Sequence, residues 1–189
     1  MTRLGGRRAT VAAVLLVGAS IVLAACSAGD GGGAPESRPA PSQEAYSYLR
    51  DEGFGCRWLT VRAEGSPERR TCTWVADTEA QRERGLMGVT DPDLGGPGAM
   101  VFDFDRPTTG GFWMKDTLLP LTVVWVGPDG RVLGSTDMTP CPAGSTCPVY
   151  PPPGPYTMAI EVARGRAAGF GLVPGAIVVL GDPCEVVPR

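Results

Sequence analysis

The sequence predicts an α+β fold that is mainly β, with an antiparallel, barrel-like sheet and one or two short helices. Three observations favour this class. Short runs of β-branched and aromatic residues recur along the chain, turn formers separate them in a sequence with 27 glycines and 19 prolines, and only two segments have helical character. We expect these strands to form a single domain over residues 46–189, a length that one hydrophobic core can stabilise without a metal.

The predicted strands follow from side-chain type and from alternation. Residues 99–104 alternate as a half-buried strand does, and Pro128-Asp129-Gly130 has the composition of a turn that joins two strands. Strands are predicted at residues 58–63, 71–76, 99–104, 112–114, 121–126, 131–133, 156–162 and 176–180.

Two helices are predicted. Thr78 and Gln81 have the spacing of a capping box, so a helix is expected to begin there and to end at Gly88, with Gly85 weakening its last turn. A second, weaker helix is predicted over residues 163–170. Both are short, which keeps the predicted fold mainly β.

The first 25 residues predict a lipoprotein signal peptide. Three arginines among the first eight residues precede an apolar run that is too short for a membrane span, and Leu23-Ala24-Ala25-Cys26 fits the bacterial lipobox. We expect cleavage before Cys26 and acyl chains such as palmitate on that residue, which would anchor the protein to the outer face of the cell membrane. An ordinary cleaved signal peptide and an uncleaved anchor are the alternatives, and Arg7-Arg8 leaves the export route open.

A flexible tether is predicted after the anchor. Residues 26–45 are almost all Gly, Ala, Ser, Pro, Glu and Asp, a composition that cannot bury enough apolar surface to offset its ordering entropy. Three of the 17 basic residues and none of the 20 acidic ones precede Cys26, so the mature chain has a formal charge of −6. Such an acidic protein repels phosphate polymers, which argues against nucleic acid as a partner.

Five cysteines follow Cys26, and an oxidising compartment favours disulfides among them. Cys141 and Cys147 bracket a short loop of turn formers and are the first predicted pair. Cys56 and Cys72 are the second, because two extended segments joined by a turn would bring them together. Cys184 would then be an odd thiol, inert or reactive. The rival arrangement pairs Cys184 with Cys56 or with Cys72.

The composition excludes several kinds of active site. The chain has no histidine, which removes Ser-His and Cys-His catalytic sets as well as imidazole zinc sites. It has no CxxC motif and no Gly-x-Ser-x-Gly elbow. We therefore expect no metal and no cofactor.

The segment from Phe112 to Leu121 is the richest in chemistry. It holds Lys115, the only lysine of the chain, between Met114 and Asp116. A desolvated amine beside an acid can act as a base, a nucleophile or an anion anchor. A structural salt bridge between Lys115 and Asp116 is the commoner arrangement.

Several motifs from Cys72 to Gly181 resemble the DUF 192 family (domain of unknown function 192). Asp116 stands where that family usually has Asn. Two further segments, around Cys141 and Cys147, are similar to the exported actinobacterial lipoprotein branch. The resemblance implies a compact β-rich fold and a secreted or membrane-linked habit, and it implies no activity or catalytic residue. The matching motifs are Ala76-Asp77-Thr78, Arg82, Gly85-Leu86-Met87, Met100-Val101-Phe102, Phe112 to Thr117, Leu119-Pro120-Leu121, Tyr156 to Val162, and Gly171 to Gly175.

The function favoured by the sequence is a lipid-anchored binding or accessory module of the cell envelope, whose partner is a small ligand or an envelope protein. Apolar side chains are expected to line its groove and polar ones to anchor the ligand. Plain core packing is the alternative for the apolar members. The candidate residues are Trp113, Met114, Lys115, Asp116, Arg84, Met87 and Asp103, with Trp125 as a further apolar candidate.

Two other functions stay open. A hydrolase or lyase acting on envelope polymers would need a pair of carboxylates across a cleft, drawn from Asp103, Asp116, Asp137 and Glu161. An envelope scaffold would use a surface patch. No recognisable catalytic set is present, so the sequence favours binding over catalysis.

Overall fold

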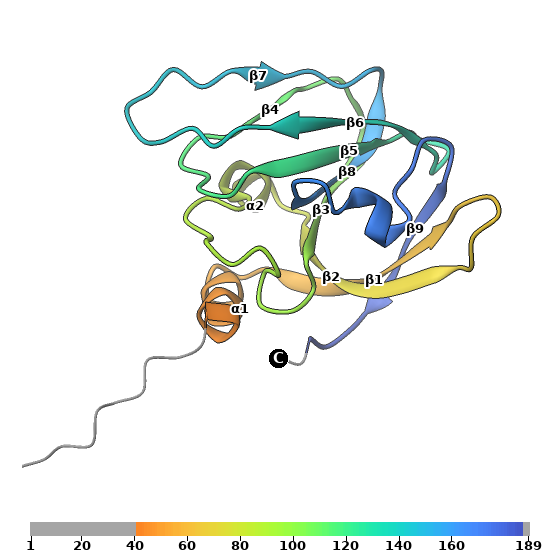
Figure 1. Ribbon diagram of the computed structural model, residues 1–189, viewed down its shortest axis with the longest axis horizontal. Helices are drawn as coiled ribbons and strands as arrows, with labels where there is room; N and C mark the ends of the chain where they lie inside the picture. Colours follow the sequence, from red (N-terminus) through yellow and green to blue (C-terminus); the bar gives the residue numbers. More distant parts are fainter. Residues whose placement is uncertain (1–40, 187–189) are drawn as a thin grey trace, which may run out of the picture. The chain divides into compact units, whose positions relative to one another are not determined.

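The computed structural model describes residues 41–186, so the predicted signal peptide, Cys26 and residues 26–40 of the predicted tether lie outside the described part. The chain folds into a seven-stranded sheet and a two-stranded sheet (Figure 1). The large sheet has the order β6-β5-β8-β3-β2-β1-β9. Its strands are β1 (Gly55–Arg62), β2 (Arg69–Ala76), β3 (Ala99–Thr108), β5 (Leu121–Val126), β6 (Val132–Met138), β8 (Tyr156–Ala163) and β9 (Ile177–Pro183), and the small sheet pairs β4 (Phe112–Trp113) with β7 (Val149–Tyr150).

The predicted mainly β class is confirmed, with two refinements. All neighbouring strands of the large sheet are antiparallel except β2 and β3, which are parallel. The sheet is also not a closed barrel. Its edge strands meet only where the turn before β6 contacts the start of β9, through backbone bonds from Val178 N–H to Gly130 C=O (2.8 Å) and from Val132 N–H to Ala176 C=O (2.9 Å). The barrel-like description therefore holds at one end of the sheet only.

The parallel pair explains why a helix covers one face of the sheet. A parallel connection must cross over from one end of a strand to the other. Here the crossover contains α2 (Glu79–Arg84) and the loop that leads to β3. We call the face that it covers the α2 face.

Both faces of the sheet are buried. Trp74, Met100 and Trp125 belong to the core on the α2 face, and Val101 and Ile160 to the core on the opposite face. The strand β5, which lies between β6 and β8, is buried along its whole length. A side chain on β3, β5 or β8 therefore enters one of two apolar layers, according to its place in the alternation.

The helices agree in part with prediction. The capping box of Thr78 and Gln81 is confirmed, but α2 ends at Gly85 and not at Gly88. The predicted helix over 163–170 is only the 3₁₀ turn η1 (Ala167–Phe170). No helix among the described residues is both long and apolar enough to cross a membrane.

One helix and one strand were not predicted. Helix α1 (Pro41–Asp51) starts inside the segment predicted as a tether, and it docks because Ala45 and Leu49, four residues apart, are both buried in the core of the α2 face. The short strand β7 has too few residues for a recognisable alternation. The low apolar content of residues 41–51 hides the helix, because only a few side chains hold it: Ala45 and Leu49 enter the core, and Tyr46 and Tyr48 pack against it.

The disulfides correct one prediction. The Cys141–Cys147 bond is confirmed, whereas Cys72 is bonded to Cys184 and Cys56 is a buried free thiol. In the β1–β2 register Cys56 lies opposite Trp74, and Cys72 lies opposite Trp58, so Cys56 and Cys72 are diagonal neighbours and not a facing pair. The predicted Cys56–Cys72 bond is therefore wrong, and the rival with Cys72 and Cys184 is the one formed.

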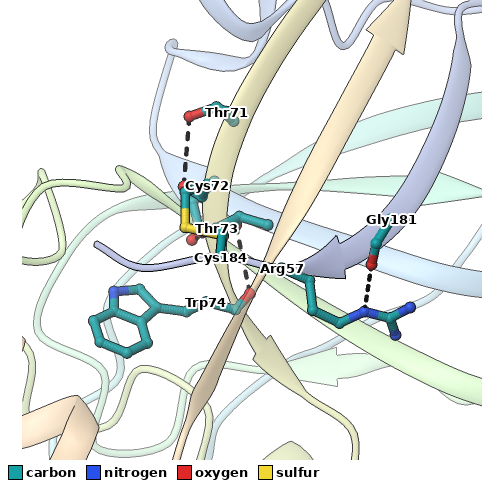
Figure 2. Close-up of a disulfide and its surroundings, with 8 residues drawn as sticks. Arg57, Thr71, Cys72, Thr73, Trp74, Gly181 and Cys184 are labelled. Atoms are coloured by element: carbon teal, nitrogen blue, oxygen red, sulfur yellow. Dashed lines mark hydrogen bonds between the residues drawn. A yellow bond between two sulfur atoms is a disulfide. The ribbon is translucent and has the colours of Figure 1, made fainter. Parts of the chain in front are cut away.

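The chain after β9 brings Cys184 to its partner (Figure 2). The backbone N–H of Cys184 donates to the C=O of Cys56 at 3.1 Å, which places it beside β1. Arg57 donates from Nε to the C=O of Gly181 at 2.7 Å and holds the preceding residues against the same strand. Because β1 lies between β2 and β9, the disulfide links the chain segments on the two sides of β1.

Candidate functional site

A cleft of about 560 Å³ opens on the α2 face. Its size falls in the range of small-molecule sites, about 300–1,000 Å³. One wall comes from α2 and the residues after it, a second from β3, a third from residues 110–113, and the remainder from Thr117 and two residues of β8. Segments far apart in the sequence therefore meet around one cavity.

The first wall owes its position to the caps of α2. Thr78 Oγ1 accepts from the Gln81 N–H at 3.2 Å, while Gln81 donates from Nε2 to the C=O of Gly53 at 2.9 Å, which fixes the helix to the end of α1. At the other end, Gly85 has a φ of 47°, and a Cβ there would lie 3.2 Å from the ring of Phe102. A glycine is needed because the chain turns directly against an aromatic ring of the cleft.

Aromatic rings form much of the cleft surface. Phe102 and Phe112 pack edge to face with ring centroids 4.8 Å apart, and Phe104 and Tyr156 do the same at 5.3 Å. Trp125 lies fully buried beneath them and contacts both Phe112 and Tyr156. The Tyr156 hydroxyl donates to the C=O of Gly110 at 2.7 Å, which ties the 110–113 wall to β8. The rings are thus held in one arrangement by their mutual packing.

A carboxyl group lies among these rings. Glu161 is on β8, in register with Met100 of β3 and Val123 of β5, two side chains with no exposed surface. It is only 4% exposed, it lines the cleft, and no hydrogen bond or ion pair joins it to any residue of the described part. Burial raises the pKa of Glu161 to about 8.

Charged side chains surround the mouth of the cleft. Arg82 donates to the C=O groups of Asp77 (2.6 Å) and Asp103 (2.9 Å), and its guanidinium lies 5.0 Å from the ring centre of Phe104. Arg84 donates to the Tyr48 hydroxyl of α1 and to the carboxylate of Glu52, the residue after α1. Three lining residues have exposed side chains with no ion pair inside the described range: Glu79, Glu83 and Arg106.

The structure brings three of the seven predicted binding residues to the cleft, namely Trp113, Arg84 and Met87. Met114 is fully buried in the core instead. Trp125 also belongs to the core, so plain core packing, the alternative to a role in the groove, is confirmed for this residue. These two residues support the cleft without lining it.

Lys115 and Asp116 do not form the expected salt bridge. The Nζ of Lys115 lies 5.7 Å from the ring centre of Trp113. Asp116 has a φ of 53°, a conformation that Asn and Asp tolerate better than most residues. Its C=O accepts from Gly88 N–H and its N–H donates to the C=O of Cys141, both at 3.0 Å, so its backbone joins the end of the α2 segment to the small disulfide loop.

The four carboxylates proposed for a hydrolase do not gather. Asp103 is three residues from Met100 on β3, so it points away from Glu161, and it pairs with Arg57 at 3.6 Å. Asp137 accepts from Thr122 Oγ1 at 2.6 Å, on the face opposite to Glu161. Of the four, only Glu161 lines the cleft. The paired-carboxylate arrangement that would favour an enzyme is absent from these residues.

The sequence predicted Glu161 only as one of four possible catalytic carboxylates and not as a binding candidate, although a signal for its burial exists. Glu161 is the one charged residue of β8 and stands between Ile160 and Val162. An acid inside such an apolar run must enter a core unless the strand is irregular. The aromatic side chains of the cleft gave no separate signal, because core aromatic residues look the same in sequence.

The sequence profile of the DUF192 family, described as "Uncharacterized ACR", matches residues 59–180. No curated protein matches the chain. Among solved structures, a protein of unknown function from Novosphingobium aromaticivorans DSM 12444 is 31% identical, with a TM-score of 0.55 over 66% of this chain and 84% of that one. A second, titled a putative transcription regulator from Sinorhizobium meliloti 1021, is 22% identical, with a TM-score of 0.55 over 67% of this chain and 95% of that one, and shows the fold alone. With the family profile covering more than half of its residues, the chain belongs to the DUF192 family.

Proposed function

We propose that this protein is a binding module of the cell envelope, anchored to the outer face of the membrane by a lipid on Cys26, and that the cleft of the α2 face is its ligand site. The observation that carries the binding role is the buried carboxyl of Glu161, which opens only to the cleft and has no partner in the described part of the chain. Buried polar groups are nearly always hydrogen-bonded, so a ligand that supplies a partner gains free energy there.

The geometry of the cleft supports binding rather than simple imperfect packing. Its aromatic rings hold one another in fixed orientations, and Tyr156 is tied to the 110–113 wall. A preformed cavity with apolar walls and few polar groups is typical of small-molecule sites. Because the walls need little rearrangement, little of the interaction free energy would be spent on ordering them.

The extracytoplasmic location has separate support. Leu23-Ala24-Ala25-Cys26 fits the lipobox, and four of the described cysteines form two disulfides, which persist in oxidising compartments. The net negative charge of the mature chain favours solubility over adhesion to anionic lipids. Attachment is therefore assigned to the lipid.

The anchor can be tested by metabolic labelling. The full-length gene is expressed in a bacterial host fed an alkyne analogue of palmitate, and the protein is examined by click detection and intact mass. We expect label on the wild type, none on Cys26→Ala, and unchanged label on the matched control Cys56→Ala. An unlabelled protein that retains residues 1–25 contradicts the proposal.

The ligand site can be tested by a thermal-shift screen of cell-wall fragments, sugars, small acids and amines. A true ligand raises the melting temperature of the wild type. Its effect is expected to disappear in Phe104→Ala, which opens the aromatic wall, and to survive in Leu133→Ala, an exposed apolar residue that does not line the cleft. A binding role for this cleft is contradicted if no compound raises the melting temperature, or if the compounds that do so raise that of Phe104→Ala equally.

A further inference from the structure

We infer that the ligand of this cleft is a cation, an amine or methylated ammonium group attached to an apolar body, with the charged group placed against Glu161 and the body against the aromatic rings. This inference rests on the binding role proposed above. It deepens that role by naming the chemical class of the ligand.

The carboxyl of Glu161 lacks a hydrogen-bond donor within the described part of the chain. A carboxylate is an acceptor with about four lone-pair sites. Its in-register neighbours Met100 and Val123 are apolar and fully buried, so they offer no donor. The only open side is the cleft, and a group entering from there has to bring the donor or the positive charge.

The aromatic rings that line the cleft also favour a positively charged ligand. The face of an aromatic ring carries partial negative charge and attracts cations, most strongly where water is excluded. Two lining rings already show this attraction, because Arg82 lies over Phe104 and Lys115, which does not itself line the cleft, lies over Trp113. The rings of Phe102, Phe112 and Tyr156 line the same cavity as the carboxyl of Glu161. Rings with an acid among them match a cation better than a neutral or anionic group.

Charged side chains from α2 and β3 also line the cleft. From α2 come Glu79 and Glu83, which have no ion pair in residues 41–186, and Arg82 and Arg84, which are held by backbone carbonyls and by Glu52 respectively. From β3 comes Arg106, exposed and without an ion pair. From β8 comes the neutral phenol of Tyr156, whose pKa burial raises to about 12.

Among the charged residues that line the cleft, only Glu161 is buried as a whole residue, although the Nε of Arg84 is also buried and has no partner in the described part. The carboxyl holds a proton in the empty cleft near neutral pH, because burial raises its pKa to about 8. A bound ammonium replaces that proton, which passes to solvent, so one positive charge leaves as one arrives. Binding is therefore coupled to proton release, and affinity for a permanent cation rises between pH 6 and pH 9.

The test compares four probes of similar shape by isothermal titration calorimetry on the full chain in detergent. Two are cations, 2-phenylethylamine and benzyltrimethylammonium. One is neutral, 2-phenylethanol, and one is an anion, 3-phenylpropanoate. We expect the cations to bind at least about tenfold more tightly than the neutral probe. Titration at pH 6.5 in two buffers of different ionisation enthalpy should show release of about one proton per cation bound.

Two variants assign the effect to Glu161. Glu161→Gln keeps the shape of the side chain and is expected to lose about tenfold or more in cation affinity while remaining folded, because no native hydrogen bond is removed. Glu64→Gln removes an exposed carboxylate that does not line the cleft and is expected to change cation affinity by less than about threefold.

The outcomes separate this inference from the binding role. Equal affinity for 2-phenylethanol, or tightest binding of 3-phenylpropanoate, overturns the cationic ligand and leaves the binding role standing. The same holds if none of the four probes binds while another fragment of the thermal-shift screen does so through Phe104. If nothing from either experiment binds, the inference and the proposed function both fall.

Discussion

At the scale of single residues, the contrast between Asp91 and Glu161 shows what sets the cleft apart. These two are the buried acidic side chains of the described chain. Asp91 is fully engaged, since its two carboxyl oxygens accept from Asp93 N–H at 3.0 Å and Gly95 N–H at 2.9 Å. Glu161 has no such donors. Asp91 therefore stabilises a loop through its hydrogen bonds, whereas the carboxyl oxygens of Glu161 make no hydrogen bond in the described part of the chain.

The unpaired acid should make stability depend on pH. The folded state binds this proton more tightly than the unfolded state, because burial raises the pKa of Glu161 from 4.5 to about 8. Below pH 4.5 both states are protonated and the full stability is present. Stability is then lost at about 1.4 kcal/mol per pH unit as the pH rises towards 8, and no further above it.

Glu161→Gln removes this titration. We expect the variant and the wild type to have similar free energies of unfolding at pH 5, and the variant to be more stable by about 3–5 kcal/mol at pH 9. Urea unfolding at both pH values measures the difference, with Glu83→Gln as the control that follows the wild type. Parallel pH profiles for wild type and Glu161→Gln would show that the carboxyl is solvated or paired.

Two buried tryptophans provide a second residue-scale prediction. Trp74 donates from Nε1 to the C=O of Leu94 at 2.7 Å, whereas Nε1 of Trp125 has no partner among the described residues. Both side chains have no exposed surface. Trp74→Phe strands a buried carbonyl and Trp125→Phe does not, so Trp74→Phe should cost about 1–2 kcal/mol more in unfolding free energy. Equal losses in chemical denaturation would refute this.

At the scale of elements, strands were easier to predict than the contacts between them. All eight predicted strand segments are present, because each carries enough β-branched and aromatic residues to mark it. The parallel β2–β3 pair and the incomplete closure depend on which edges meet, and no local pattern encodes that. The cleft was predictable only where its residues are unusual in their context, as Trp113 and Arg84 are; Phe102 and Tyr156 resemble any core residue.

The docking of α1 can be tested at one glycine. Gly95 has a φ of +72°, and a Cβ there would lie 2.6 Å from the backbone nitrogen of Tyr46. Gly65 has nearly the same φ, +71°, with nothing within 4 Å. Alanine at either site incurs the cost of a left-handed conformation, about 1 kcal/mol, but only Gly95→Ala also displaces α1.

We therefore expect Gly95→Ala to lower the unfolding free energy by about 1–3 kcal/mol more than Gly65→Ala does. Hydrogen exchange should show faster exchange in α1 for the first variant alone. Identical behaviour of the two variants would mean that α1 does not pack where the structure places it.

At the scale of the whole molecule, the Cys72–Cys184 bond closes most of the domain into one loop. Its cysteines are 112 residues apart, and those of the Cys141–Cys147 bond are 6 apart. In the chain-entropy model the long loop contributes about 4.8 kcal/mol and the short one about 2.2 kcal/mol. Without the long bond, β9 and the residue after it stay attached to β1 through hydrogen bonds only: the β1–β9 ladder, the bond from Arg57 to Gly181 and the bond from Cys184 to Cys56.

Replacing both cysteines of each pair by serine tests this ranking. The Cys72→Ser/Cys184→Ser variant should lose about 2–3 kcal/mol more than Cys141→Ser/Cys147→Ser in urea unfolding. Both are made in a Cys56→Ala background, so that no free thiol remains to exchange. A larger loss from the short loop would show that native-state contacts, rather than chain entropy, dominate.

The distance along the chain between Cys72 and Cys184 also governs the order of events during biosynthesis. A polypeptide made from its N-terminus presents Cys56 and Cys72, on neighbouring strands, long before Cys184 exists. An oxidant that acts before Cys184 has been synthesised can therefore join Cys72 only to a cysteine that is not its final partner. If that cysteine is Cys56, the Cys184 thiolate would have to attack Cys72 and release Cys56 as the free thiol that is buried in the folded protein. The Cys72–Cys184 bond therefore cannot form until residue 184 has been synthesised.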